Sequence, residues 1–184
     1  MAAASFLRAF YLSHLSKPAG DRVLYRLIQK QKVRGILELG VGDGRRACQM
    51  IALAQRVSLG ERIQYVGIDL FEGRGPADGP GLSLKRAYQI LGATGARVQL
   101  IPGDPYSALA RTANSLKDLD LIVLSSRLDR ASLERAWFYF PRILHPSTRV
   151  FREQITPNGE QTLHRVEHME ITRLSEAVST RRAA

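Results

Sequence analysis

Short apolar segments alternate with amphipathic segments along most of the chain, and this alternation limits the possible folds more than any other feature. Strands are predicted at residues 35–39, 63–68, 98–101, 119–124 and 149–152. Helices are predicted between them at 45–57, 82–91, 106–115 and 132–140. Strands that alternate with helices form parallel βαβ units, and their helices cover both faces of the sheet. We therefore expect an α/β fold with a doubly wound, mostly parallel, Rossmann-like sheet.

The chain of 184 residues has the length of a single domain, 1–184. The predicted helices and strands divide this domain into four parts. Residues 1–32 are expected to form N-terminal helices, at 5–15 and from Asp21 to about Gln31, and residues 33–153 the core. The pair Asn158-Gly159 predicts a tight turn, so residues 154–178 are expected to form an antiparallel hairpin. Its strands would be 162–166 and 170–174, although 170–174 fits a helix equally well. Residues 179–184 are expected to be a disordered tail.

The composition excludes several classes of protein. Cys48 is the only cysteine, which excludes a disulfide framework and a cysteine-rich metal site and favours a reducing cytoplasm. No apolar stretch approaches the roughly 20 residues that a membrane-spanning helix needs, so no membrane partner is expected. Residues 1–20 contain no acidic residue and could be a transit peptide. The helical spacing of Phe6, Leu7, Phe10, Tyr11 and Leu15 favours a docking helix instead.

The net charge of +10 leaves two interpretations open. It could indicate a polyanionic partner such as RNA. It could also reflect arginines spread along the chain without a binding patch, and the pattern favours this, since the only tight clusters are Arg45-Arg46 and Arg181-Arg182. A nucleic-acid partner is therefore possible, and a small-molecule substrate is the simpler expectation.

Four separate segments follow predicted strands and are expected to meet at one edge of the sheet. They are the glycine turn 40–44, Asp69, Gly103-Asp104 and Ser125. Ligands of open α/β sheets bind beyond the carboxyl ends of the strands, where these segments lie. The glycine turn does not match the dinucleotide pattern G-x-G-x-x-G, because Arg45 stands at its last position. The Gly-Lys-Ser/Thr of a phosphate-binding loop is absent too.

The segment Glu38-Leu39-Gly40-Val41-Gly42-Asp43-Gly44 resembles motif I of the class I S-adenosylmethionine (SAM) methyltransferases in spacing and strand context. The resemblance extends in order from Val33 to Phe151. It implies a Rossmann-like methyltransferase fold with SAM as the cofactor. It also implies that the turn formed by Gly40, Gly42 and Gly44 holds the methionine part of SAM, with Glu38 near its amino group.

The resemblance also assigns roles to the ends of the second and third strands. Asp69 is similar to the acidic residue that accepts both ribose hydroxyls, and a carboxylate can accept two such donors. Leu70 and Phe71 would offer apolar surface to the adenine, and Asp104 would accept a hydrogen bond from its amino group. Each carboxylate keeps an alternative: Glu38 as a solvated strand end, Asp69 as a helix cap, and Asp104 as part of an ordinary turn.

The fourth strand departs from the family pattern. Ser125 stands where metal-dependent O-methyltransferases carry a metal-binding aspartate, and the Asn/Asp-Pro-Pro-Tyr motif of many N-methyltransferases is absent. We therefore expect a metal-independent enzyme that methylates an unidentified small molecule. A catalytically inactive binding module and an RNA methyltransferase are the alternatives.

The sequence identifies no catalytic residue and leaves one loop open to two interpretations. A base, if one is needed, would come from the histidines, and His145 could approach the site from the loop before the last parallel strand. The other histidines are His14, His164 and His168. The glycine- and proline-rich segment 73–81 could be a lid or a mobile surface loop.

Overall fold

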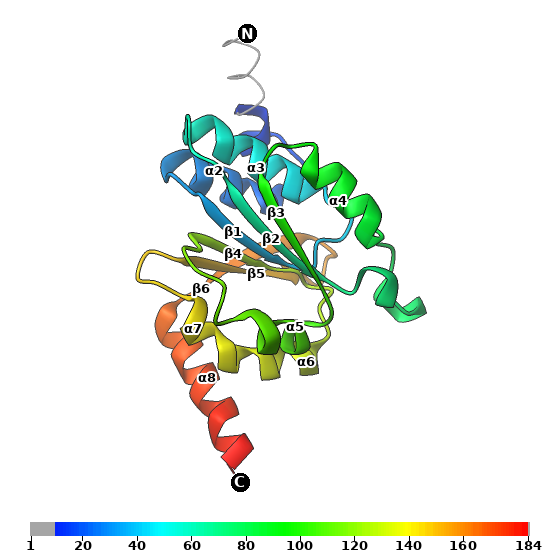
Figure 1. Ribbon diagram of the computed structural model, residues 1–184, viewed down its shortest axis with the longest axis vertical. Coiled ribbons are helices and arrows are strands. Elements are labelled where there is room, and N and C mark those ends of the chain that lie inside the picture. The colour runs from blue at the N-terminus through cyan, green and yellow to red at the C-terminus, as the bar shows by residue number, and fades with distance from the viewer. Residues whose placement is uncertain (1–9, 184) are drawn as a thin grey trace.

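The computed structural model describes residues 10–183, which contain one six-stranded sheet in the order β3-β2-β1-β4-β5-β6 (Figure 1). The strands are β1 (Gly35–Leu39), β2 (Gln64–Asp69), β3 (Arg97–Pro102), β4 (Leu121–Leu124), β5 (Arg149–Ile155) and β6 (Gln161–Val166). The first five are parallel, and β6 is antiparallel to β5. The predicted doubly wound, mostly parallel sheet is therefore confirmed.

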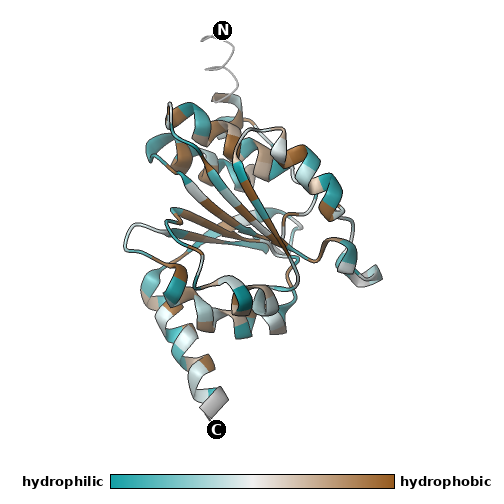
Figure 2. Cartoon of the chain, viewed as in Figure 1, coloured by the Kyte–Doolittle hydropathy of each residue, from teal (hydrophilic) through white to brown (hydrophobic). Residues whose placement is uncertain are grey.

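Helices cover both faces of the sheet (Figure 1). One face carries α2 (Arg22–Lys30), α3 (Arg45–Val57) and α4 (Leu84–Gly92). The other carries α5 (Pro105–Thr112), α6 (Arg130–Ala136), α7 (Phe140–Ile143) and α8 (His168–Ala183). Because strand side chains alternate between faces, Ile36 joins the core on the first face, while Leu37 and Leu39 join the core on the second. Figure 2 shows the apolar residues concentrated along the strands and on the helix faces that meet them.

The C-terminal region differs from the expected hairpin over 154–178. Asn158-Gly159 does form the turn, with Gly159 at φ +79°, but it joins β5 to β6. Of the two interpretations of 170–174, the helix is the correct one, because this segment lies in α8, and the helix continues through most of the expected tail. Ile171 is 1% exposed, and Leu174 and Val178 follow it at helical spacing against the same core. Burial of this stripe favours the helix over a strand.

The N-terminal helices agree with prediction only in part. Residues 10–14 are helical, while the rest of the expected docking helix, 5–9, lies outside the described residues. Leu12 is the buried apolar residue of this turn, whereas Phe10, Tyr11 and Leu15, the described residues of the expected apolar face, are exposed. Asp21 does not cap α2 with its side chain, which is buried instead. Among residues 10–183, no helix has the length and apolar character to cross a bilayer.

The helix predicted at 132–140 begins two residues earlier and does not stop at Pro141. The chain passes from α6 through a short 3₁₀ turn, Trp137–Tyr139, into α7, which contains Pro141 in its first turn. Proline is tolerated there because the first amides of a helix have no partner within the helix.

Candidate functional site

The glycine turn after β1 has the conformation that its sequence predicts. Gly40, Gly42 and Gly44 adopt φ values of +88°, +61° and +75°, which favour glycine. A Cβ on Gly40 would lie 2.6 Å from the Cβ of Ser125, so this glycine also lets the ends of β1 and β4 approach closely. A Cβ on Gly42 would have no neighbour within 4 Å. The turn therefore presents bare backbone to open space beyond the sheet.

Asp69 ends β2 and is 5% exposed. Its Oδ2 accepts a hydrogen bond from the Gly42 amide at 3.0 Å, and its Oδ1 accepts one from the Phe71 amide at 3.3 Å. The alternative role as a helix cap is thus present in part, since Phe71 begins a 3₁₀ turn, Phe71–Gly73. The same carboxylate joins the glycine turn to the end of β2, as the convergence of strand ends predicted.

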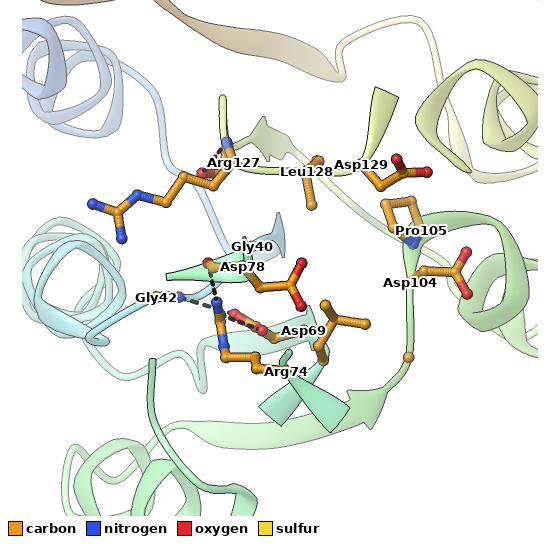
Figure 3. Close-up of a pocket in the computed structure, with 13 residues that line it drawn as sticks. Gly40, Gly42, Asp69, Arg74, Asp78, Asp104, Pro105, Arg127, Leu128 and Asp129 are labelled. Carbon is orange, nitrogen blue, oxygen red and sulfur yellow. Dashed lines mark hydrogen bonds and ion pairs between the residues drawn. The ribbon is translucent and has the colours of Figure 1, made fainter. Parts of the chain in front are cut away.

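Arg74 also binds Asp69, and the sequence did not indicate this contact. Its Nη2 lies 2.5 Å from Asp69 Oδ1, and its Nη1 donates to the Asp78 carbonyl at 3.2 Å (Figure 3). The Nε of Arg74 is buried and has no hydrogen-bond partner. Figure 3 shows the side chain reaching from the 73–81 loop across the end of β2. In this conformation Arg74 and Asp78 of the 73–81 loop line the cavity at the site.

A cavity of about 50 Å³ lies between the glycine turn and the start of α5. Leu70, Arg74, Asp104, Ser125 and Leu128 are among the residues that line it. Small-ligand sites usually enclose about 300–1,000 Å³, so this cavity is smaller than a typical ligand site in the present conformation.

The residues predicted to face the adenine have different positions. Leu70 lines the cavity, but Phe71 is buried in the core shared with α3 and α4, and the structure does not bring it to the cavity. Asp104 lines the cavity and also caps α5, with its Oδ1 accepting from the amides of Tyr106 and Ser107. Burial raises the pKa of Asp104, but hydrogen bonds from Ser107 and Ser132 and from the two amides outweigh it, so the pKa falls to about 2. Asp104 therefore has the structural role of a turn residue, and its contact with adenine stays a prediction.

Glu38 is fully buried, which rules out a solvated strand-end carboxylate. Arg46 Nε lies 2.7 Å from its Oε1, and the Tyr65 hydroxyl donates to its Oε2 at 2.6 Å. Burial raises its pKa, and the arginine opposes this effect. The Arg46 Nη1 also contacts Glu153 at 2.5 Å and Asp21 at 3.5 Å. Glu38 is thus the innermost member of a buried charge cluster, which we call the Arg46 cluster (Asp21, Glu38, Arg46 and Glu153).

The Arg46 cluster forms one wall of a second cavity of about 750 Å³. Asp21, Arg46 and Glu153 line this cavity, whereas Glu38 lies behind them. The second cavity shares Gly40, Gly42, Ser125 and Arg127 with the first one, so the two adjoin at the carboxyl ends of β1 and β4. The strand order reverses between these two strands, which is where open α/β sheets bind their ligands.

The histidines lie elsewhere. His145 lies 3.9 Å from Asp120, whose carboxylate accepts from the amide of Gly35 at the start of β1. The loop before β5 is therefore at the edge of the sheet opposite the glycine turn, and His145 does not approach the site. None of the four histidines lines either cavity, within residues 10–183.

Arg46 is the site residue that sequence reasoning had the best means to find. The side chain of its neighbour Arg45 is 86% exposed and pairs with Asp43, whereas the Arg46 side chain is only 12% exposed. Arg46 precedes the buried Met50 by four residues, so helical periodicity places it on the inner face of α3. The local sequence around Asp21, Arg74 or Glu153 does not distinguish these residues from charged residues on the surface.

Comparisons with known proteins give matches at the level of structure only. No protein-family profile matches the chain, and no curated protein sequence matches it. The solved O-methyltransferase from Bacillus cereus in complex with SAH is similar over 96% of this chain and 79% of its own, with 17% identity and a TM-score of 0.57. The O-methyltransferase TomG from Streptomyces achromogenes, solved with SAM and involved in tomaymycin synthesis, is similar over 96% and 78%, with 14% identity and a TM-score of 0.55.

A third similar structure is the TehB-like SAM-dependent methyltransferase from Corynebacterium glutamicum. The match covers 97% of this chain and 84% of that one, with 19% identity and a TM-score of 0.51. At this low identity the likeness shows the fold alone, so the function has to be argued from the site itself. The chain therefore has the fold of the class I SAM-dependent methyltransferases.

Proposed function

We propose that this chain is a SAM-dependent methyltransferase that methylates a small molecule without a metal ion. The observation that carries the proposal is Asp69, a buried carboxylate at the end of β2 that is hydrogen-bonded to the glycine turn. It lies beside the point where the strand order reverses, in a fold whose solved examples include complexes with SAM and SAH. A carboxylate at this place suits the two hydroxyls of a ribose.

The residues at this edge fit SAM in kind. The glycine turn offers open backbone to the methionine part, Asp69 offers acceptors to the ribose, and Leu70 and Asp104 line the space for the adenine. SAM supplies an activated methyl group on a sulfonium, so the protein needs no nucleophile of its own. The task of the chain is to hold the acceptor in line with that methyl group, since orientation alone can contribute several kcal/mol.

Arg74 has to leave Asp69 before the ribose can bind. In the present conformation the guanidinium takes the place of the hydroxyl donors, and the cavity of about 50 Å³ is too small for a nucleoside. The buried Arg74 Nε without a partner favours this exchange, because an unsatisfied donor makes the closed contact less stable. We infer that the 73–81 loop opens when the cofactor binds.

Ser125 supports metal independence, and the second cavity supports a small acceptor. The end of β4 carries a serine whose Oγ accepts from the Arg127 amide at 3.3 Å, and a neutral hydroxyl is a poor substitute for a metal-binding carboxylate. The second cavity, of about 750 Å³, has the size of a pocket for a small molecule.

Substitution of Asp69 tests the cofactor assignment. Wild-type protein should bind SAH with micromolar affinity in isothermal titration calorimetry, and Asp69→Asn should bind it about 10- to 100-fold more weakly. This is the range expected when a charged hydrogen-bond acceptor is lost. Asp118→Asn is the matched control: Asp118 is exposed at the opposite edge, and its φ of +56° is tolerated by asparagine. Undiminished affinity in a folded Asp69→Asn protein would refute the ribose assignment.

A catalytically inactive binding module is the second candidate, and the Arg74–Asp69 ion pair favours it because it closes the ribose position. Incubation with methyl-labelled SAM and a fractionated cell extract separates the two. Label in a small-molecule fraction supports the enzyme. SAH binding without label in any fraction supports the inactive module.

A further inference from the structure

The second cavity contains buried charges that cofactor binding does not explain. Asp21 is 4% exposed and Glu153 is 7% exposed, and both line this cavity together with Arg46. Asp21 comes from the turn before α2, Arg46 from α3 and Glu153 from β5, so three distant segments bring charge to one wall. Buried charges are unfavourable unless they are paired, so each of them calls for a partner.

The Arg46 cluster contains more negative than positive charge. Three carboxylates, Asp21, Glu38 and Glu153, surround the single guanidinium of Arg46. An arginine carries one positive charge, so the cluster has an excess of two negative charges when all three acids are ionised. A positively charged ligand group beside this wall would compensate for part of that excess.

Asp21 has the longest ion pair with Arg46 of the three carboxylates. Glu38 has close donors on both oxygens, from Arg46 and Tyr65, and Glu153 has them from Arg46 and from the Ser126 hydroxyl at 2.5 Å. The ion pair of Asp21 with Arg46 is long, at 3.5 Å. The Tyr25 hydroxyl donates to Gln49 and is also close to Asp21, since burial and the charge and side-chain hydrogen bonding of Asp21 raise the pKa of this hydroxyl. Asp21 thus retains capacity for a further donor, at the wall of an open cavity.

The mouth of the same cavity has the opposite charge. The exposed charged residues of its lining are Lys17, Arg127 and the paired Arg45 and Asp43, so these exposed positions carry a net positive charge, whereas the buried acids Asp21 and Glu153 line the same cavity. A ligand with an amine at one end and an anionic group at the other would match both ends. The cavity is also much larger than the aminocarboxypropyl chain of SAM requires, so it has room for a second molecule.

We propose that the second cavity binds the methyl acceptor as a small zwitterion, with its amine against Asp21 and its anionic group toward Lys17 and Arg127. Asp21 is the catalytic base of an N-methylation. This inference rests on the proposed function, because the methyl donor is SAM. An ammonium group provides both the positive charge and the hydrogen-bond donors that the wall lacks.

The reaction is balanced with these groups alone. The ammonium gives a proton to the Asp21 carboxylate and becomes an amine with a free electron pair. The nitrogen forms a bond with the methyl carbon while the C–S bond breaks, and that electron pair stays on sulfur, which becomes neutral. The product is a methylammonium, and Asp21 releases its proton to solvent. Burial raises the pKa of Asp21 to about 6, with Arg46 opposing and Glu38 and Glu153 adding to the effect, so the carboxylate is ionised and basic at neutral pH.

Two measurements on Asp21→Asn test the proposal, with Asp118→Asn as the matched control. SAH affinity should stay within threefold of wild type, because the acceptor rather than the cofactor contacts Asp21. Methyl transfer from labelled SAM into a small-molecule extract should fall at least 100-fold at pH 7.5. The wild-type rate should rise with pH around 6, and the residual rate of the variant should lack this rise. The labelled product should bind a cation exchanger in acid and keep its label in alkali.

Several outcomes would overturn the proposal. An alkali-labile methyl ester or a neutral methyl ether would assign a hydroxyl or carboxyl acceptor. SAH binding weakened more than tenfold by Asp21→Asn would assign Asp21 to the amino group of the cofactor. Unchanged methyl transfer by the variant would show that Asp21 is not the catalytic base. SAH binding by wild-type protein without any labelled product would show that no methyl group is transferred. If wild-type protein does not bind SAH, the proposed function fails first and this inference falls with it.

Discussion

At the scale of single residues, Arg74 determines whether the ribose position is open. The ion pair with Asp69 must be broken before a ribose can take its place. Arg74→Ala removes the competing group, so SAH should bind about three- to tenfold more tightly, a gain of roughly 1 kcal/mol. Isothermal titration calorimetry measures the change, and Arg86→Ala, at an exposed site on α4, is the control. Weaker binding by Arg74→Ala would mean that the arginine contacts the cofactor instead of excluding it.

A glycine offers an independent way to displace the same side chain. A Cβ on Gly81 would lie 2.2 Å from Arg74 Nε and 2.4 Å from its Cζ, so Gly81→Ala cannot keep the guanidinium in place. It should reproduce the tighter SAH binding of Arg74→Ala. Gly73→Ala in the same loop is the comparison, because its Cβ would have no neighbour within 4 Å.

Asp21 should make the stability of the protein depend on pH. Its pKa is raised from 3.8 to about 6, mainly by burial. The folded state therefore binds more protons than the unfolded state between about pH 4 and 6, and this group reduces the free energy of unfolding as pH rises through that window. The full effect of a shift of this size is up to about 3 kcal/mol.

Thermal unfolding of Asp21→Asn and wild type between pH 4 and 7 tests this expectation. The variant lacks the titration, so its stability relative to wild type should increase as pH rises from 4 to 6.5. A difference that does not change with pH would show that Asp21 titrates normally. The same experiment establishes that the variant folds, which the transfer assay requires.

At the scale of secondary-structure elements, α8 contributes to the core in place of the second strand expected there. Ile171 is 1% exposed and packs in the core between the sheet and helices α5–α8. Ile171→Ala should lower the free energy of unfolding by about 2–4 kcal/mol, the usual effect of such a truncation in a core. Met169→Ala on the same helix is the control, because Met169 is 73% exposed. Denaturant unfolding measures both, and equal stabilities would contradict the packing of α8.

The glycine turn and the helix behind it show how an element joins the fold to its site. The turn itself was predictable, because three alternating glycines after an apolar strand allow few other conformations. The same pattern did not reveal that α3 would direct Arg46 toward Glu38, Asp21 and Glu153. The inner face of a helix follows from its period, but the groups that it meets there depend on other elements.

At the scale of the whole molecule, the net charge of +10 should produce weak binding to polyanions. A labelled single-stranded RNA should be retained at about 20 mM salt and released by about 200 mM, since attraction to phosphates alone decreases steeply with salt. Filter binding at both concentrations measures this. Retention at 200 mM salt would instead favour the RNA methyltransferase alternative over a small-molecule acceptor.

The sequence by itself determined the parallel sheet, the succession of its strands and helices along the chain, and the meeting of the glycine turn, Asp69 and Asp104 at one edge. These follow from local causes: side-chain periodicity, the conformational freedom of glycine, and the rule that the carboxyl ends of parallel strands share an edge. Only the tertiary structure decided that Arg74 covers Asp69 and that His145 lies at the opposite edge. It also decided that residues 21, 46 and 153 form one charged wall. Burial, ion pairing and shifted pKa values depend on which distant segments meet, and no local pattern contains that information.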